Sequence, residues 1–118
     1  MQLQLATLEQ AKKLKELGFD EKTQLFYIQA KSGDRIYIPP VALALKWLRE
    51  VKRICVDIIT CQKKREESRL WMYEVKSDNG YRLMPLRPDQ TANTYEEAES
   101  AGLDLALDKL LKEKNERD

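Results

Sequence analysis

Histidine is absent from the chain, which removes the side chain that most often serves as a general base near neutral pH. Without it, the Ser–His and Cys–His pairs of acyl-transfer and thiol-protease chemistry cannot form. The four glycines, at positions 18, 33, 80 and 102, form no G-x-G-x-x-G or G-x-x-x-x-G-K loop that could hold phosphates. These residue types favour a protein that is not an enzyme and has no catalytic residues.

The two cysteines, Cys55 and Cys61, lie six positions apart in a segment with the composition of a strand. Six steps of extended chain separate two Cα atoms by about 20 Å, whereas a disulfide allows at most about 7 Å. We therefore expect two reduced thiols, as in a cytosolic protein. A structural zinc ion needs about four thiolate or imidazole ligands, so neither a metal nor a cofactor is expected.

Carboxylates alone can support hydrolysis, as in glycosidases and in nucleases that use divalent cations. Asp57 is the most unusual acid, because it lies in an apolar segment and alternates with Cys55 and Ile59 on one face. It is either a solvent-facing strand residue or a functional acid, and no second carboxylate is predicted to converge on it. A carboxylate-dependent enzyme is therefore the least favoured function.

Basic residues gather in the middle of the sequence and could contact the phosphates of a nucleic acid. Residues 46–87 hold eleven Lys or Arg against six Asp or Glu, whereas residues 88–118 hold four against nine. This asymmetry permits a nucleic-acid surface, and it equally permits a contact between basic and acidic elements within the chain or between two copies. The candidate nucleic-acid contacts are Arg49, Arg53, Lys63, Lys64, Arg65 and Arg69.

Aromatic residues near these cations, namely Trp71, Tyr73 and Tyr81, could stack on the bases of a single strand. The alternative is that a helix covers them, because Trp and Tyr on a covered sheet face usually belong to the core. Glu66 and Glu67 also dilute the positive charge of the loop. The core interpretation is favoured, so nucleic-acid binding is an alternative function.

The N-terminal part of the chain predicts a helix followed by a β-hairpin. Thr7 and Gln10 have the spacing of a capping box and precede an apolar stripe of helical period, so a helix is predicted over residues 7–17. Residues 23–31 and 35–38 are rich in β-forming side chains and flank a Ser-Gly-Asp turn, which indicates a hairpin.

A second helix is predicted over residues 40–52. Pro40 suits its first turn, where the missing N–H would be unpaired in any case. The spacing of the apolar residues indicates a helix that covers the core with one face. That face is expected to hold Val41, Ala44, Leu45, Leu48 and Val51, with Trp47 at its border.

Three strands are predicted next, over residues 54–61, 69–76 and 81–86, as a meander of neighbouring strands. In the central one, Trp71 shares a face with Tyr73 and Val75, so this face should meet a layer of helices. Trp71 is expected to anchor the core.

A last helix is predicted from Thr94, which forms a capping box with Glu97, to about position 111. The polar residues 112–118 are expected to fray. The helix is apolar over more than one narrow stripe, and the extra width could pack against the core or against a partner protein. The candidate protein contacts are Leu103, Leu107, Leu110 and Leu111.

The chain of 118 residues is long enough for one domain with its own core. Its longest apolar run, residues 41–45, is far shorter than the roughly 20 residues that cross a bilayer, so no membrane association is expected. The N-terminus lacks the features of a secretory signal, and we expect a cytoplasmic protein. The predicted fold is a single α+β domain with the order α-β-β-α-β-β-β-α and a mostly antiparallel sheet packed by helices.

Three segments together resemble small uncharacterised proteins that prophages and mobile elements of gut anaerobes encode. They are ATLEQAKKLKELGF (residues 6–19), PPVALALKWLRE (39–50) and TYEEAESAGLDLALDKLL (94–111). No activity is attached to such proteins, so the resemblance implies an accessory role and no functional residue. Residues 80–111, a strand followed by a Thr-x-Glu-Glu-Ala helix start, are similar to the end of HicB-type antitoxins, although the proline-glycine-cysteine stretch of that family is absent.

The sequence therefore predicts a non-enzymatic accessory protein that acts as an interaction module. Its partner would be another protein or a second copy of the chain, bound through the last helix and a sheet edge. The alternative is a nucleic-acid-binding or antitoxin-like regulator that uses the basic middle segment.

Overall fold

The structure, a computed structural model, describes residues 4–23, 25–29, 31–62, 69–77 and 90–117. The predicted α+β class and the order α-β-β-α-β-β-β-α are both confirmed. The helices and strands are α1 (Leu8–Glu16), β1 (Phe26–Ile28), β2 (Arg35–Tyr37), α2 (Val41–Trp47), the π-helical segment η1 (Leu48–Lys52), β3 (Ile54–Gln62), β4 (Arg69–Ser77), β5 (Thr91–Ala92) and α3 (Tyr95–Arg117).

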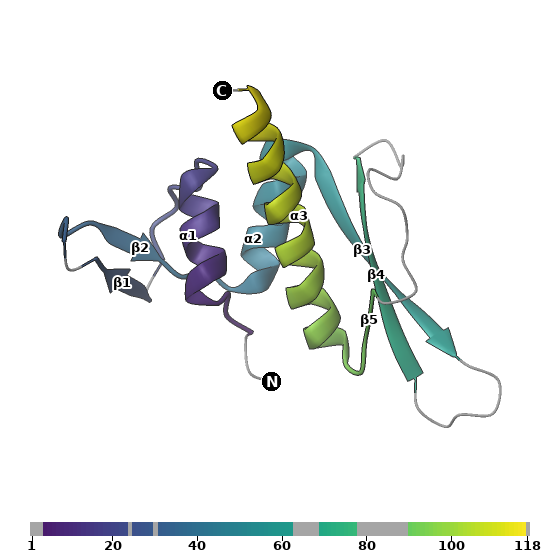
Figure 1. Ribbon diagram of the computed structural model, residues 1–118. Helices are drawn as coiled ribbons and strands as arrows, with labels where there is room; N and C mark the ends of the chain where they lie inside the picture. Colours follow the sequence, from purple (N-terminus) through teal and green to yellow (C-terminus); the bar gives the residue numbers. More distant parts are fainter. Residues whose placement is uncertain (1–3, 24, 30, 63–68, 78–89, 118) are drawn as a thin grey trace.

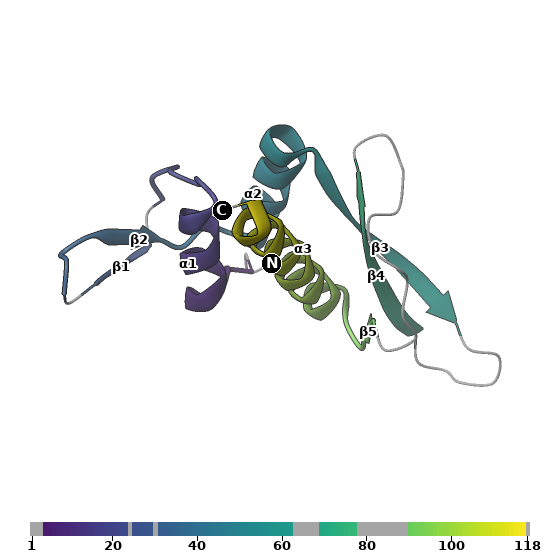
Figure 2. The same ribbon diagram turned by 45° about the horizontal axis from the view of Figure 1, so that its top comes forward.

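The long helix α3 organises the molecule, because it lies between the sheet on one side and α1 on the other, with α2 behind it (Figure 1). The sheet is antiparallel with the strand order β3-β4-β5, and β1 and β2 form a separate hairpin beyond α1. The view from above in Figure 2 shows the same sequence of layers, from the hairpin through α1 and α3 to the sheet. The hairpin and the three-stranded sheet therefore lie at opposite ends of the molecule.

One apolar core joins the three helices to strands β3 and β4. Leu14 of α1, Val41 of α2 and Leu103 of α3 are almost completely buried in it. Phe19, just after α1, meets Trp47 edge to face with 5.5 Å between the ring centroids. Burying apolar surface of this kind is the main stabilising contribution to a fold. No helix of the described residues is long and apolar enough to cross a membrane.

The N-terminus of α1 forms the predicted capping box. The backbone N–H of Gln10 donates to Oγ1 of Thr7 at 3.1 Å, and the backbone N–H of Thr7 donates to Oε1 of Gln10 at 2.9 Å. Nε2 of the same glutamine donates to the side chains of Ser100 and Asp104 on α3, at 3.1 and 3.0 Å. The cap therefore also fixes α1 against α3.

The second helix departs from its prediction in its last turns. Residues 48–52 form a π-helical segment, and Arg53 ends it in the left-handed conformation with φ 59°. Because each turn of a π-helix holds more residues than an α-helical turn, side chains rotate away from their α-helical positions. Val51, predicted to be buried, is 56% exposed, and Trp47, predicted at the border, is buried. Arg53 then turns the chain into β3.

The register of β3 against β4 sets Val56 opposite Val75 and Asp57 opposite Glu74. Val56 and Val75 face α3, and the acidic pair faces away from it. Trp71 lies on the face covered by helices, as predicted, but it is only half-buried. Its ring meets Tyr95 edge to face at 5.3 Å, so it covers the start of α3 rather than anchoring the centre of the core.

Two predicted boundaries differ near the C-terminus. The predicted strand over residues 81–86 lies outside the described residues, and the third strand of the described sheet is the short β5 in a stretch expected to be a loop. Helix α3 continues to Arg117, where fraying was expected. Lys109 pairs with Glu113 at 2.6 Å, and Nζ of Lys114 donates to the carbonyl of Glu16 at 2.9 Å. The first contact stabilises the last turns of α3 from within, and the second holds them against α1.

Candidate interaction surfaces

The β1–β2 hairpin carries the largest run of exposed apolar side chains in the described structure. Leu25, Phe26, Tyr27 and Ile28 follow one another along the chain and are 47, 37, 46 and 55% exposed. Successive strand residues point to opposite faces, so both faces of β1 are apolar and neither is fully covered. Exposed apolar surface of this kind marks contact sites in soluble proteins. We call these four residues the hairpin patch.

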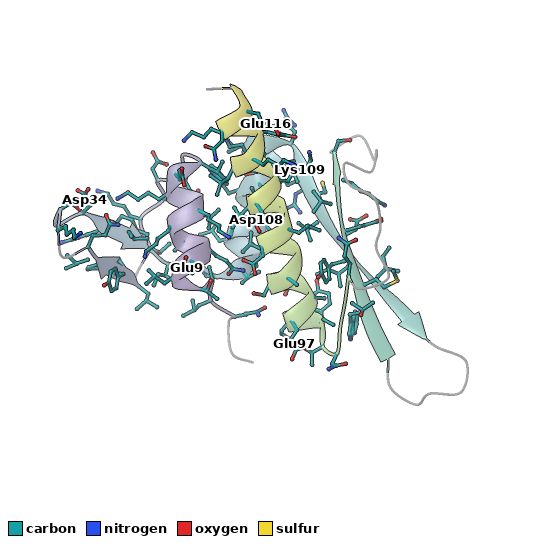
Figure 3. The ribbon with its side chains drawn as sticks, viewed as in Figure 1. Glu9, Asp34, Glu97, Asp108, Lys109 and Glu116 are labelled. Atoms are coloured by element: carbon teal, nitrogen blue, oxygen red, sulfur yellow. The ribbon has the colours of Figure 1, made fainter. Side chains whose placement is uncertain are left out.

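Contacts within the hairpin keep this patch in a defined shape. The rings of Phe26 and Tyr37 meet edge to face with 5.9 Å between centroids. The guanidinium of Arg35 lies 4.6 Å above the ring of Phe26, a cation–π contact. Gly33 supplies the turn with φ 74°, and Asp34 lies beside it at the tip (Figure 3). The patch is therefore presented by an ordered strand.

The outer edge of β1 has backbone groups that pair with no strand among the described residues. The backbone N–H of Ile38 donates to the carbonyl of Leu25, and that of Gln29 donates to Asp34, each at 2.9 Å. Hydrogen-bonded pairs alternate along an antiparallel ladder, so the backbone groups of Phe26 and Ile28 point away from β2. No described segment pairs with this edge of β1. The hairpin patch can accept a further strand.

A groove of about 430 Å³ runs between α2 and β3. Lys46 and Arg49 border it on the helical side, and Val56 and Ile58 border it on the strand side. Lys46 and Arg49 form no ion pair with any residue that the structure describes. Two cations without an ion-pair partner among the described residues therefore lie beside β3, in a groove that Asp57 and Glu99 also line. We call this feature the β3 groove.

The first turns of α3 close the far end of the β3 groove with Tyr95 and Glu99. Burial raises the pKa of the Glu99 carboxyl above its ordinary 4.5, and the neighbouring Glu96 raises it further. Burial also raises the pKa of the Tyr95 hydroxyl, with smaller contributions from Glu99 and Glu96. This end of the groove therefore disfavours additional negative charge.

Asp57 lies opposite Glu74, and both acids contact one cation. Nζ of Lys76 is 2.9 Å from Oδ2 of Asp57 and 2.9 Å from Oε1 of Glu74, whose side chain is only 3% exposed. The hydrogen bonds to Glu74 and then to Asp57 raise the pKa of the Lys76 ammonium above its ordinary 10.5. Asp57 thus has a cross-strand ion-pair partner. The described residues contain no group of three or more acidic or cysteine side chains placed to hold a metal ion.

The predicted nucleic-acid contacts are only partly described. Arg49, within η1, and Arg53, directly after it, are exposed, and Arg53 has an interaction partner. Lys63, Lys64 and Arg65 lie outside the described residues, and only the backbone of Arg69 is described, in β4. The structure therefore describes the side chains of two of the six cations and leaves the other four as predictions.

The predicted protein contacts on α3 face inward. Leu103 and Leu107 are completely buried, and Leu110 and Leu111 are half-buried against the same core. The broad apolar surface of this helix packs against the sheet on one side and against α1 and α2 on the other. In this conformation Leu103 and Leu107 are not accessible to a partner.

The hairpin patch is the candidate surface that the sequence analysis missed. Its signal was present, because four consecutive apolar residues in a two-stranded hairpin cannot all point to one covered face.

No protein-family model, no curated protein and no solved structure matches this chain. Function must therefore be argued from the surfaces themselves.

Proposed function

We propose that this protein is a non-enzymatic interaction module that pairs with a second copy of itself through the hairpin patch. The observation that carries the proposal is the exposure of four consecutive apolar side chains, Leu25 to Ile28, on an ordered strand with a free edge. Among the described strands β1 pairs only with β2, and a third strand would add further stability to this two-stranded hairpin.

The sequence of the hairpin patch suits pairing with itself. A two-fold axis through Tyr27 sets Phe26 of one copy opposite Ile28 of the other, and the reverse. Pairs of an aromatic and a β-branched residue stabilise antiparallel strands by about 0.2–1 kcal/mol each. The patch contains no charged residue, so self-pairing brings no like charges together. An isologous dimer of this kind is the commonest form of protein assembly.

The resemblance of three segments to small phage and prophage proteins adds the expectation of an accessory role in a mobile element. Such a role needs no catalytic group of its own. A heterologous protein could occupy the same edge of β1, and a chain that stays monomeric would favour that partner over a second copy.

Sedimentation velocity over a wide range of concentration tests the proposal. The wild type is expected to shift from monomer to dimer, and the double variant Tyr27→Ser with Ile28→Ser is expected to stay monomeric. Ile59→Ser is the matched control, because Ile59 is 47% exposed but lies on the distant sheet. A wild type that is monomeric at every concentration, or a dimer that survives the hairpin substitutions, contradicts self-pairing.

The second candidate is a nucleic-acid-binding or antitoxin-like regulator. The observation that favours it is the pair of exposed arginines, Arg49 and Arg53, at the end of η1. Anisotropy titrations with labelled single-stranded and duplex oligonucleotides test it. Steep weakening by salt, together with loss of binding on Lys63→Glu, Lys64→Glu and Arg65→Glu, would place this function first.

A further inference from the structure

The outer edge of β3 presents backbone groups that no described segment uses. In the sheet order β3-β4-β5, strand β4 is central, and among the described residues β3 has a neighbouring strand on one side only. β3 is nine residues long and pairs with β4 in continuous register from Ile54 to Gln62. Long exposed edges invite pairing with another chain, and folded proteins usually cover or interrupt them.

The direction of the ladder identifies the free groups. The backbone N–H of Tyr73 donates to the carbonyl of Gln90 at 3.3 Å, so the backbone of Tyr73 points toward β5. The backbone N–H and C=O groups of successive residues in an antiparallel strand point alternately to the two neighbouring strands, so those of Glu74 point toward β3. Glu74 and Asp57 lie opposite each other, and they are therefore the pair that exchanges hydrogen bonds.

The backbone groups of the residues on either side of Asp57 consequently point away from β4. The N–H and C=O groups of Val56 and Ile58 face the free edge, and both residues border the β3 groove. The side chains of Val56 and Ile58 lie on the face that α3 covers, so the side chains of an added strand opposite them would enter the groove. An unused edge and a groove of about 430 Å³ thus coincide.

The charged residues that line the β3 groove indicate what kind of segment would bind there. Two acids, Asp57 and Glu99, border the groove together with Lys46 and Arg49. Asp57 is paired with Lys76, whereas Lys46 and Arg49 form no ion pair within the described structure. In the register centred on Asp57, antiparallel pairing of β3 with a second copy would set two Asp57 carboxylates opposite each other, and like charges opposed on a sheet are destabilising. An acidic side chain of another protein would be favoured at the two cations.

We infer that the β3 edge is a second binding site, which takes an extended acidic segment of another protein as an added strand beside Val56 and Ile58. One inward side chain of that segment is Asp or Glu and contacts Lys46 and Arg49. A second inward side chain is apolar and contacts Tyr95. The residue between them faces Asp57 and is not acidic. Main-chain hydrogen bonds supply the affinity and the groove supplies the specificity, as in other cases of strand addition.

The inference extends the proposed function but uses different residues, so the two can fail separately. A random peptide display library is selected on the purified full chain, and the enriched peptide is labelled and titrated by fluorescence anisotropy. Ile58→Pro is the diagnostic variant, because it removes an N–H that points to the free edge and leaves the ladder to β4 intact. Lys46→Glu with Arg49→Glu tests the charge on the helical side, and Lys12→Glu on α1 is its matched control.

Enriched peptides are expected to share an alternating pattern with one Asp or Glu two positions from an apolar residue. Their affinity should fall more than tenfold with Ile58→Pro and with the charge-reversed pair, and it should be unchanged with Lys12→Glu and with the Tyr27→Ser and Ile28→Ser variant. If Ile58→Pro does not fold, the variant with Lys46→Glu and Arg49→Glu tests the inference instead, because both substituted residues are exposed.

Three results would overturn the inference. The first is a selection in which no peptide is enriched on the wild type relative to the Lys46→Glu and Arg49→Glu variant. The second is an enriched peptide that binds the folded Ile58→Pro variant as tightly as the wild type. The third is a wild-type dimer that Ile58→Pro converts to monomer, which would assign the edge to a second copy of the chain.

Discussion

The side chain of Val56 lies so close to Gly102 that a Cβ built on this glycine would overlap Cγ1 of the valine. The contact brings the backbone of α3 onto β3 and sets the position of the free edge. Gly102→Ala is therefore expected to destabilise the fold by about 1–3 kcal/mol through overpacking, although alanine favours a helix. Urea denaturation monitored by circular dichroism measures the loss.

The matched test of that contact is the Val56→Ala substitution in the Gly102→Ala background. Removing the two methyl groups of Val56 makes room for the new Cβ, so the double variant should lose less stability than the sum of the single variants. Strict additivity of the two losses would show that the two residues do not press on each other.

A buried glutamine joins the first and last helices. Nε2 of Gln10 donates to Oδ1 of Asp104 at 3.0 Å and to the carbonyl of Ser100 at 3.0 Å. Gln10→Leu leaves these acceptors and the N–H of Thr7 without their partner, and we expect a loss of about 1–3 kcal/mol. Thermal and urea unfolding measure it. An unchanged unfolding midpoint would contradict the bridging role.

The Gln10→Glu variant separates the two roles of Gln10, which are the capping of α1 and the hydrogen bonds to α3. The introduced carboxylate can still accept from the Thr7 N–H, but it can no longer donate to Asp104 and adds a like charge beside it. This variant should be less stable than the wild type at neutral pH and should recover in acid, where the introduced carboxyl takes up a proton. A pH-independent difference would indicate that repulsion from Asp104 plays no part.

A surface ion pair reinforces the same helix contact. Nζ of Lys13 lies 2.7 Å from Oδ1 of Asp108, and this hydrogen bond is the main reason that the pKa of Lys13 is raised above 10.5. A lysine whose pKa is raised by folding contributes stability below 10.5, and that contribution is lost as the pH rises through its folded-state pKa. Because the pair is partly exposed, the contribution should be within about 1 kcal/mol.

The test is the stability difference between the wild type and Lys13→Met as a function of pH. The wild type should be the more stable protein near neutral pH, and the difference should shrink once the pH exceeds 10.5. A difference that persists after the ammonium has lost its proton would assign the effect to packing of the lysine chain instead.

Burial of Glu99 destabilises its charged form. Its pKa is raised above 4.5, chiefly by burial and secondly by Glu96, so the folded state binds a proton more tightly than the unfolded state does. The penalty for ionising this group is absent below 4.5 and appears as the pH rises through the folded-state pKa. Glu99→Gln should therefore raise the melting temperature at neutral pH and have little effect in acid, which calorimetry can measure. A stabilisation equal at both pH values would contradict this.

Local signals in the sequence located most of the elements. The Thr7 and Gln10 pair marked the start of α1 to within one residue, and the same chemistry marked α3, where the N–H of Glu97 donates to Oγ1 of Thr94 at 3.1 Å. The alternation of apolar residues also placed Val75 on the face that helices cover. These features depend on neighbours in the chain, which is why the sequence alone predicts them.

Features that depend on tertiary structure were not predictable in the same way. The π-helical turn that exposes Val51 lies where the chain passes from α2 to β3, and the sequence has no local signature for it. The inward packing of Leu103 and Leu107 required knowing that α3 is covered on two sides. The β3 groove needed both the sheet order and the position of α2, and neither follows from spacing.

Self-pairing through the hairpin patch is tested most directly by a dilution series of ¹⁵N–¹H correlation spectra. The amide signals of Phe26 and Ile28, whose N–H groups point to the free edge of β1, are expected to shift most as the concentration rises, and the signals of Val56 and Ile58 should stay in place. The Tyr27→Ser and Ile28→Ser variant should show no concentration dependence. Spectra that do not change with concentration, or changes confined to β3, would contradict the proposal.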